Sequence, residues 1–187
     1  MTTFSALLTQ PSGTERRLSA GGLNRLRAGV LGANDGIVSV AAIVVGVAGA
    51  SSSRVAVLTA GVAGLVAGAL SMAAGEYVSV SSQRDAERAA HVPPAQQTDP
   101  WHAALASLAA FVVGGLVPML VALVPWAHAA VVPAIAAGVV LALVVTGAVS
   151  ARVSGADPRR AVVRNVTGGS VAMAVTYGIG MLVGLAL

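Results

Sequence analysis

The chain has 187 residues, of which 56% are hydrophobic and 10% are charged, and its mean hydropathy is +0.84. A soluble domain carries about 25% charged residues, so these values exclude an ordinary soluble enzyme and a disordered polar chain. All eleven basic residues are arginine, and the formal net charge is +4. The arginines lie between apolar runs and do not form a basic patch interleaved with aromatic residues, which argues against nucleic acid as a partner. The chain has no cysteine, which excludes disulfides and thiolate metal sites.

The first segment, residues 1–27, predicts a polar tail and not a secretory signal. Its start has no basic residues, and residues 12–24 are too polar for the apolar core of a signal peptide. We expect the tail to lie in the cytoplasm and to end in a short interfacial helix around residues 23–27. The remainder, residues 28–187, predicts a single transmembrane domain.

Five apolar runs follow, each long enough for a membrane-spanning helix, which needs about 20 residues. They cover residues 30–50, 55–80, 103–124, 129–151 and 166–187. Backbone groups in lipid must be hydrogen-bonded within the chain, so runs of this length form helices. The predicted fold class is therefore an all-α integral membrane protein with five transmembrane helices. The connections are too short for a soluble catalytic domain, and we expect no enzymatic activity.

The arginines predict the orientation of these helices. Ten of the eleven precede the first span or lie in the second and fourth connections, which share one side of a five-span chain. Only Arg54 falls on the other side. Because positively charged loops stay inside the cell, the N-terminus is predicted to be cytoplasmic and the C-terminus extracytoplasmic.

Two acidic residues lie well inside the predicted spans, Asp35 in the first and Glu76 in the second. An ionisable residue in the membrane is costly and is a functional candidate by default. Two plainer interpretations stay open at this point. Asp35 can cap the first helix from the interface if Asn34-Asp35-Gly36 forms a turn, and the Glu76 carboxylate can extend to the cytoplasmic surface.

The depth of these residues places them near one another. At about 1.5 Å per residue, Asp35 and Met72 both lie about 10–12 Å from the cytoplasmic face, and Glu76 lies one turn nearer to it. The second span also has a stripe with four-residue spacing, formed by Ala60, Gly64, Gly68, Met72 and Glu76. Glycines at this spacing let another backbone approach closely. A similar stripe in the fifth span, Ala172, Thr176, Gly180 and Gly184, predicts helix packing and not chemistry.

The donor atoms of this group suit a transition metal. Thioether sulfur favours softer divalent ions such as Fe²⁺ or Mn²⁺ over Mg²⁺ and Ca²⁺, although other divalent transition metals also fit. Carboxylates must lose their protons to bind a metal, so metal and protons compete for the same groups. A single methionine in a helix is, however, usually a core residue. The residues alone predict an intramembrane polar site.

Two longer motifs resemble a known family. Residues 31–39, Leu-Gly-Ala-Asn-Asp-Gly-Ile-Val-Ser, and residues 68–83, Gly-Ala-Leu-Ser-Met-Ala-Ala-Gly-Glu-Tyr-Val-Ser-Val-Ser-Ser-Gln, are similar to the two signature segments of the vacuolar iron transporter family. The resemblance extends from about Arg25 to the end of the chain. It implies a five-helix subunit that forms a homodimer, with an ion path at the subunit interface, and export of Fe²⁺ or Mn²⁺ in exchange for protons.

The resemblance also implies roles for particular residues. Asp35 and Met72 correspond to the aspartate and methionine of the path, and Glu76 corresponds to the glutamate of the second motif. From its depth, we expect Glu76 to receive the metal at the cytoplasmic mouth and to carry a proton. Secondary candidates along the path or at its approach are Asn34, Ser39, Gln83, Asp85 and Glu87. We expect the transported metal to be a substrate, with no permanently bound cofactor.

The chain departs from the family pattern between the second and third spans. Iron-storing members carry a Glu- and Met-rich domain there, whereas this chain has only residues 82–102, as in short prokaryotic-type members. The helix is predicted to continue through residues 83–88 and to stop at Pro93-Pro94, so Asp85 and Glu87 are a reduced approach site or merely a solvated helix end.

The expected setting is the plasma membrane of a prokaryote. The expected partners are membrane lipid, a second copy bound through small-residue helix faces, and a separate cytoplasmic metal donor that replaces the missing domain. The alternative function is that of a non-transporting scaffold or regulatory dimer that retains the transporter fold.

Overall fold

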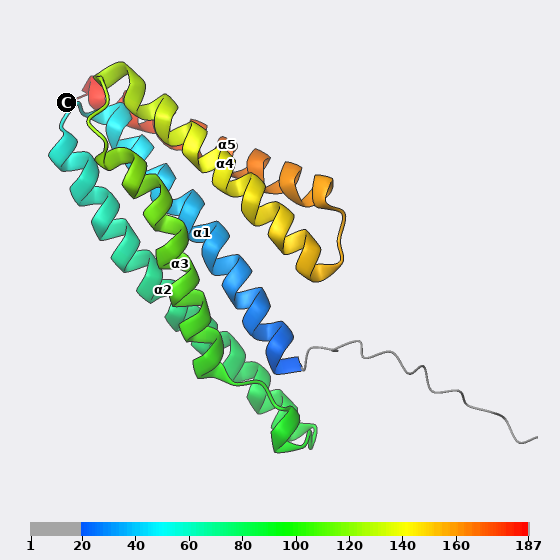
Figure 1. Cartoon of the computed structure of the whole chain (residues 1–187). Helices are drawn as coiled ribbons and strands as arrows, with labels where there is room; N and C mark the ends of the chain where they lie inside the picture. Colours follow the sequence, from blue (N-terminus) through cyan, green and yellow to red (C-terminus); the bar gives the residue numbers. More distant parts are fainter. Residues whose placement is uncertain (1–19, 187) are drawn as a thin grey trace, which may run out of the picture.

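The computed structural model describes residues 20–186, and this part of the chain is a bundle of long helices joined by short loops (Figure 1). The helices are α1 (Ala20–Ala50), α2 (Arg54–Ala89), α3 (Pro100–Leu123), α4 (His128–Ser154) and α5 (Pro158–Ala186), with a single 3₁₀ turn, η1 (Pro94–Gln96), before α3. All five α-helices are long and apolar enough to cross a membrane, and residues 20–186 contain no strand. The chain is thus an all-α membrane protein with five membrane-spanning helices, as predicted.

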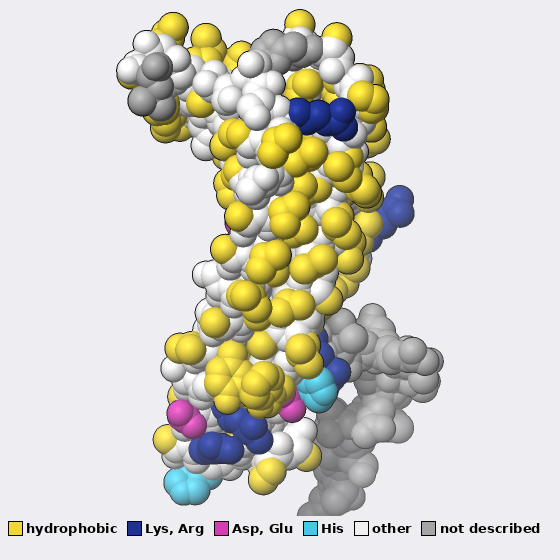
Figure 2. Space-filling model, turned by 90° about the vertical axis from the view of Figure 1, so that its left-hand side faces the viewer, with side chains coloured by type: hydrophobic (Ala, Val, Ile, Leu, Met, Phe, Trp, Pro, Cys, Tyr) yellow, Lys and Arg dark blue, Asp and Glu magenta, His cyan; other side chains and the backbone are white. Residues whose placement is uncertain are grey.

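The bundle has two chemically different ends. At the basic end, α1 begins, residues 90–99 join α2 to α3, and residues 155–157 join α4 to α5. At the opposite end, which we call the far end, residues 51–53 and 124–127 form the connections. Figure 2 shows a broad hydrophobic band between the two ends, with charged side chains gathered mainly toward one of them. Every described arginine except Arg54 belongs to the basic end.

Two helices begin earlier than their apolar runs predict. Residues 23–27 are not a separate interfacial helix; they form part of the first turns of α1, which is continuous from Ala20 to Ala50. The rest of the predicted tail, residues 1–19, lies outside the described residues. α5 begins at Pro158 and not near residue 166, because Pro is favoured in the first helical turn and the Asp157 carboxylate accepts a hydrogen bond from the backbone N–H of Arg159 at 2.9 Å.

α2 is much longer than a single span requires. Its 36 residues extend about 54 Å, whereas the hydrocarbon core is about 30 Å thick. The apolar part ends near Val80, so the turns that follow extend beyond the membrane at the basic end. They continue to Ala89 before the chain turns at Pro93-Pro94, which confirms the predicted extension of this helix.

α1 is the central helix, because it packs against each of the other four. In Figure 1 it runs between the α2–α3 pair and the α4–α5 pair. Close contact with α3 depends on glycine: a Cβ added at Gly32 or Gly36 would overlap the backbone carbonyl of Ser107 or Phe111. The predicted packing stripe of α5 is confirmed at the far end, where Gly180 lies against the backbone of Gly46.

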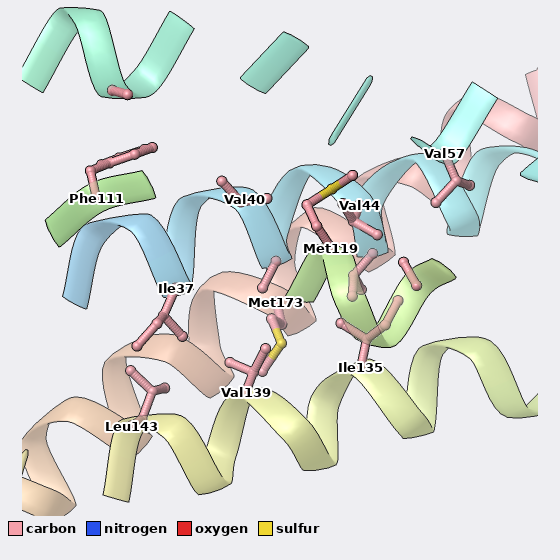
Figure 3. Packing of buried hydrophobic residues seen from close by; sticks show 14 residues of the cluster. Ile37, Val40, Val44, Val57, Phe111, Met119, Ile135, Val139, Leu143 and Met173 are labelled. Carbon is pink, nitrogen blue, oxygen red and sulfur yellow. The ribbon is translucent and has the colours of Figure 1, made fainter. Parts of the chain in front are cut away.

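The hydrophobic core is built mainly from α1, α3, α4 and α5. Figure 3 shows Ile37, Val40 and Val44 of α1 together with buried side chains of α3, α4 and α5. α2 contributes only Val57 and Ala69 to the buried members of this cluster. Much of α2 is therefore free of core packing, and this leaves a groove along its contact with α1.

Candidate functional site

The three principal residues predicted from the sequence line one groove between α1 and α2. Asp35, Met72 and Glu76 lie along it, and its volume is about 610 Å³. The ring of Phe111 from α3 forms part of its wall, and the other lining residues are Leu31, Ser39, Ile43, Gly64, Ala67, Gly68, Ser71 and Gly75. Side chains from two helices far apart in sequence thus share one space, as their similar depth in the membrane predicts.

α1 supplies the groove with residues spaced four apart, namely Leu31, Asp35, Ser39 and Ile43, which share one face of a helix. Asp35 is half-buried and lies in the middle of the continuous helix. The alternative of a turn at residues 34–36 is therefore wrong. The Ser39 hydroxyl donates a hydrogen bond to the backbone carbonyl of Asp35 at 2.6 Å, which fixes that hydroxyl near the carboxylate-bearing residue.

α2 supplies Gly64, Gly68, Met72 and Glu76, again four residues apart. The predicted face is therefore present, but its glycines meet side chains and not another backbone. A Cβ at Gly64 would overlap Ile43, and a Cβ at Gly68 would overlap the ring of Phe111. These glycines keep the groove open beside bulky neighbours within the same chain.

Met72 is half-buried and has two environments. It packs against the edge of the hydrophobic core and also lines the groove. Met72 can therefore be a core residue and also a candidate ligand, because one side of its side chain faces the core and the other faces the groove.

Glu76 is 6% exposed, and its carboxylate forms an ion pair with Arg27 of α1, with 3.0 Å between Oε2 and Nη2. The carboxylate therefore does not extend to the surface, which was the plainer interpretation of this residue. The Arg27 side chain is 53% exposed, so the guanidinium lies between the groove and solvent at the basic end. It also donates hydrogen bonds to the Asn24 side-chain oxygen at 3.2 and 3.4 Å.

Arg27 is the residue that sequence reasoning missed. In the sequence it contributes only to the charge bias that predicts orientation. The spacing could have indicated it, because Arg27 lies four residues before Leu31 and so shares the helix face of Leu31, Asp35 and Ser39. The ion pair itself depends on how α1 and α2 pack, which the spacing within α1 does not determine.

The remaining candidates lie elsewhere. Asn34 does not line the groove, and its side-chain oxygen is buried without a hydrogen-bond partner in the described part of the chain. Asp85 is exposed and pairs with Arg88 at 3.5 Å. Gln83 donates to Glu87 at 2.9 Å, and both lie on the part of α2 beyond the apolar run.

Glu87 holds the α2–α3 connection in place. Its Oε2 atom accepts hydrogen bonds from the backbone N–H of Thr98 at 2.8 Å and from the Thr98 hydroxyl at 3.1 Å. The backbone N–H of Thr98 lowers the pKa of the Glu87 carboxyl below its ordinary value, assisted by the hydrogen bond from Gln83. These contacts give Glu87 a structural role in the loop.

The donor set of the groove is small. Within residues 20–186, no group of three or more His, Cys, Asp or Glu side chains could hold a metal ion. The groove offers two carboxylates, one thioether and two serine hydroxyls, those of Ser39 and Ser71. An ion in it would need further ligands from water or from another chain.

These features define a helical membrane protein whose spanning region holds a groove that carries two carboxylates and a thioether. The sequence model of the VIT family matches residues 26–92 and 89–181, which together cover most of the chain. The chain belongs to the VIT family, in agreement with the resemblance of its two motifs.

Curated relatives show the same relationship. The chain is 44% identical over 173 residues to "Vacuolar iron transporter homolog 3" of Oryza sativa subsp. japonica, covering 82% of this chain and 69% of that protein. It is 43% identical over 195 residues to "Vacuolar iron transporter homolog 1" of the same plant, covering 93% and 83%. "Vacuolar iron transporter homolog 3" of Arabidopsis thaliana is 42% identical, with 85% and 83% covered. Their names describe transporters and not enzymes.

Proposed function

We propose that this protein transports Fe²⁺ or Mn²⁺ out of the cytoplasm through the groove between α1 and α2, in exchange for protons. The observation that carries the proposal is the shared groove itself, which brings Asp35, Met72 and Glu76 together inside the spanning region. Charged side chains in this position mark ion paths in membrane proteins. The names of the relatives, which refer to iron transport, support the same conclusion.

The chemistry of the donors supports a transition metal as substrate. Glu76, at the basic end of the groove, receives the ion, and Asp35 and Met72 bind it further in. The thioether favours Fe²⁺ or Mn²⁺ over Ca²⁺ and Mg²⁺, which prefer oxygen ligands alone. Because the carboxylates bind metal only when deprotonated, a proton gradient can drive release of the ion. We assign no catalytic step and no resident cofactor.

The direction of transport rests on the charge asymmetry of the two ends. The basic end is placed in the cytoplasm because arginine-rich connections stay inside. We place the protein in the plasma membrane of a prokaryote, because its short α2–α3 connection resembles that of the prokaryotic-type members of the family. The names of the plant relatives refer instead to the vacuole.

The partners follow from the exposed surface of α2. We propose that two copies pair along this helix and close the groove, because Ala67, Ser71 and Ala74 are exposed there and a Cβ added at Gly75 would meet no neighbouring atom within 4 Å. The short connection at residues 90–99 offers little surface for collecting metal, so a separate cytoplasmic donor is proposed as well.

The test is metal transport by purified protein in liposomes. Metal uptake and accompanying proton flux are measured for Fe²⁺, Mn²⁺, Co²⁺, Zn²⁺ and Ca²⁺ with the wild type and with Asp35→Asn. We expect Fe²⁺ and Mn²⁺ to be transported and the variant to lose at least about 90% of the flux, since a tenfold loss equals about 1.4 kcal/mol, less than a charged ligand contributes.

The matched control is Asp157→Asn, which removes the same charge from an exposed ion pair with Arg160 in the α4–α5 connection. It should transport like the wild type. Equal flux in wild type and Asp35→Asn would remove Asp35 from the mechanism. A wild type that moves none of these metals would overturn the transporter proposal and favour the non-transporting scaffold.

A further inference from the structure

We propose that Arg27 is a tethered cation that occupies the Glu76 carboxylate when the groove is empty, and that an entering divalent metal must displace it. This inference rests on the proposed transport function. It gives the mouth of the groove a built-in competitor for the metal, and it gives Arg27 a role beyond that of a topological signal.

The first support is the burial of Glu76. A carboxylate that is 6% exposed is costly in the membrane region unless an opposite charge compensates it. The guanidinium of Arg27 lies within ion-pair distance of this carboxylate, at 3.0 Å. It thus supplies the positive charge that the metal would otherwise supply.

The second support is the way Arg27 is held. Its Nη2 atom donates to Glu76 and also to the Asn24 oxygen, and its Nε atom donates to the same oxygen. These contacts direct the guanidinium from the solvent side of α1 across to α2. A residue that served only to mark the cytoplasmic side would need no such orientation.

The third support is the position of the pair relative to the groove. Arg27 and Glu76 lie at its basic end, and Leu31 and Asp35 follow Arg27 on the same face of α1. A metal approaching Asp35 from the basic end therefore meets the ion pair first. Because Arg27 is half-exposed, its guanidinium can leave Glu76 and remain hydrated.

The metal can reach the Glu76 carboxylate only by displacing the Arg27 guanidinium. The guanidinium stays charged at any physiological pH, so it cannot leave the carboxylate by losing a proton. A divalent ion carries twice the charge of a guanidinium, so at equal distance its attraction to the carboxylate is about twice as large, and its other ligands add to this. Once the metal moves on, Arg27 returns and restores the neutral pair.

The experiment compares Arg27→Gln with wild type in liposomes, with Mn²⁺ uptake measured over a range of concentrations. Without the competitor, the Mn²⁺ concentration for half-maximal uptake should fall about tenfold, which equals about 1.4 kcal/mol, the order of one charge-assisted hydrogen bond. The control is Arg160→Gln, which removes an equal charge from an exposed pair at the same end and should leave this concentration unchanged.

A second comparison separates displacement from a general effect of charge. In a Glu76→Gln background, Arg27→Gln should shift the half-maximal concentration no further, since the carboxylate for which the two cations compete is gone. A shift of the same size in this background would overturn the displacement mechanism. If Arg27→Gln does not fold, Arg27→Lys keeps the charge but loses the paired donors that hold the Arg27 guanidinium on Asn24. It should shift the concentration in the same direction by a smaller factor.

The outcomes distinguish this inference from the transport proposal. Wild-type uptake with an unchanged half-maximal concentration in Arg27→Gln, or in Arg27→Lys where only that variant folds, would overturn the role of Arg27 and leave transport standing. If the ion pair is purely structural, Arg27→Gln should lower the thermal stability and leave the half-maximal concentration unchanged. That result would also overturn the displacement proposal. A wild type that moves no Mn²⁺, Fe²⁺, Co²⁺ or Zn²⁺ would overturn both.

Discussion

At the scale of single residues, the groove shows how one side chain can serve two surfaces. Met72 packs against the core and also lines the groove together with Asp35 and Glu76. Met119 and Met173, in contrast, are buried in the core alone. The residue type is the same at all three positions, so only the surroundings distinguish a methionine that lines the groove from one that fills the core.

This difference predicts the effect of replacing the sulfur of Met72. Met72→Leu keeps the volume and should cost less than about 1.5 kcal/mol of stability, but it removes the thioether that we propose as a ligand. We expect the preference for Mn²⁺ over Ca²⁺ to decrease, because hard ions do not need the thioether. The measurement is competition of Ca²⁺ against Mn²⁺ uptake in liposomes.

Met173→Leu is the matched control, since it makes the same exchange inside the core. It should leave the metal preference unchanged whatever it does to stability. A Met72→Leu protein that discriminates between the two ions as well as the wild type would show that the sulfur is not a ligand.

At the scale of elements, glycine determines how closely the helices approach. Gly36 lies against the backbone carbonyl of Phe111, and Gly114 of α3 lies against that of Ala33. The same contacts position the Phe111 ring as a wall of the groove. The packing of α1 on α3 thereby supports the site as well as the bundle.

Gly36→Ala tests this element-level role. The added methyl group must push α1 from α3, and overpacking of this kind costs about 1–3 kcal/mol. We expect a lower midpoint of thermal unfolding in detergent, followed by the fluorescence of the two tryptophans.

Gly29→Ala on the same helix provides the comparison, because nothing lies within 4 Å of its added Cβ. Alanine is favoured over glycine in a helix by about 1 kcal/mol, so this variant should unfold at the same temperature as the wild type or higher. If Gly36→Ala unfolded at the same temperature as the wild type, the close α1–α3 contact would not contribute to stability.

At the scale of the whole molecule, the surfaces of the bundle are unequal. α1 is covered by its four neighbours, whereas α2 exposes most of its length. The groove lies at the border of this exposed surface and opens toward it. In the proposed dimer, a second copy on α2 would close this open side and add ligands for the proposed metal substrate.

Single cysteines can test this arrangement, because the chain has none of its own. Ser71→Cys, in the exposed part of the groove lining, should form a covalent dimer with a short thiol cross-linker in the membrane. Leu141→Cys, which is exposed on α4, should stay monomeric under the same conditions. Cross-linking through position 141 and not through position 71 would place the partner on α4 and contradict pairing along α2.

Local sequence patterns predict the number of spans and three residues that line the groove, Asp35, Met72 and Glu76. Apolar runs predict five helices because lipid leaves the backbone no other way to bond its polar groups, and four-residue spacing placed Met72 and Glu76 on one face of α2. The helix starts at Ala20 and Pro158 were less predictable, because the added turns contain polar and arginine residues that are equally compatible with a tail.

Only the tertiary structure decided which charges neutralise one another. Arg27 and Glu76 are 49 residues apart in the chain, and no pattern within α1 or α2 shows that their side chains meet. Their contact depends on the angle and register at which the two helices cross, which the glycines of α1 and the Phe111 ring of α3 establish together. The sequence by itself determined that a carboxylate lies in the membrane, and the packing of three helices decided that an arginine covers it.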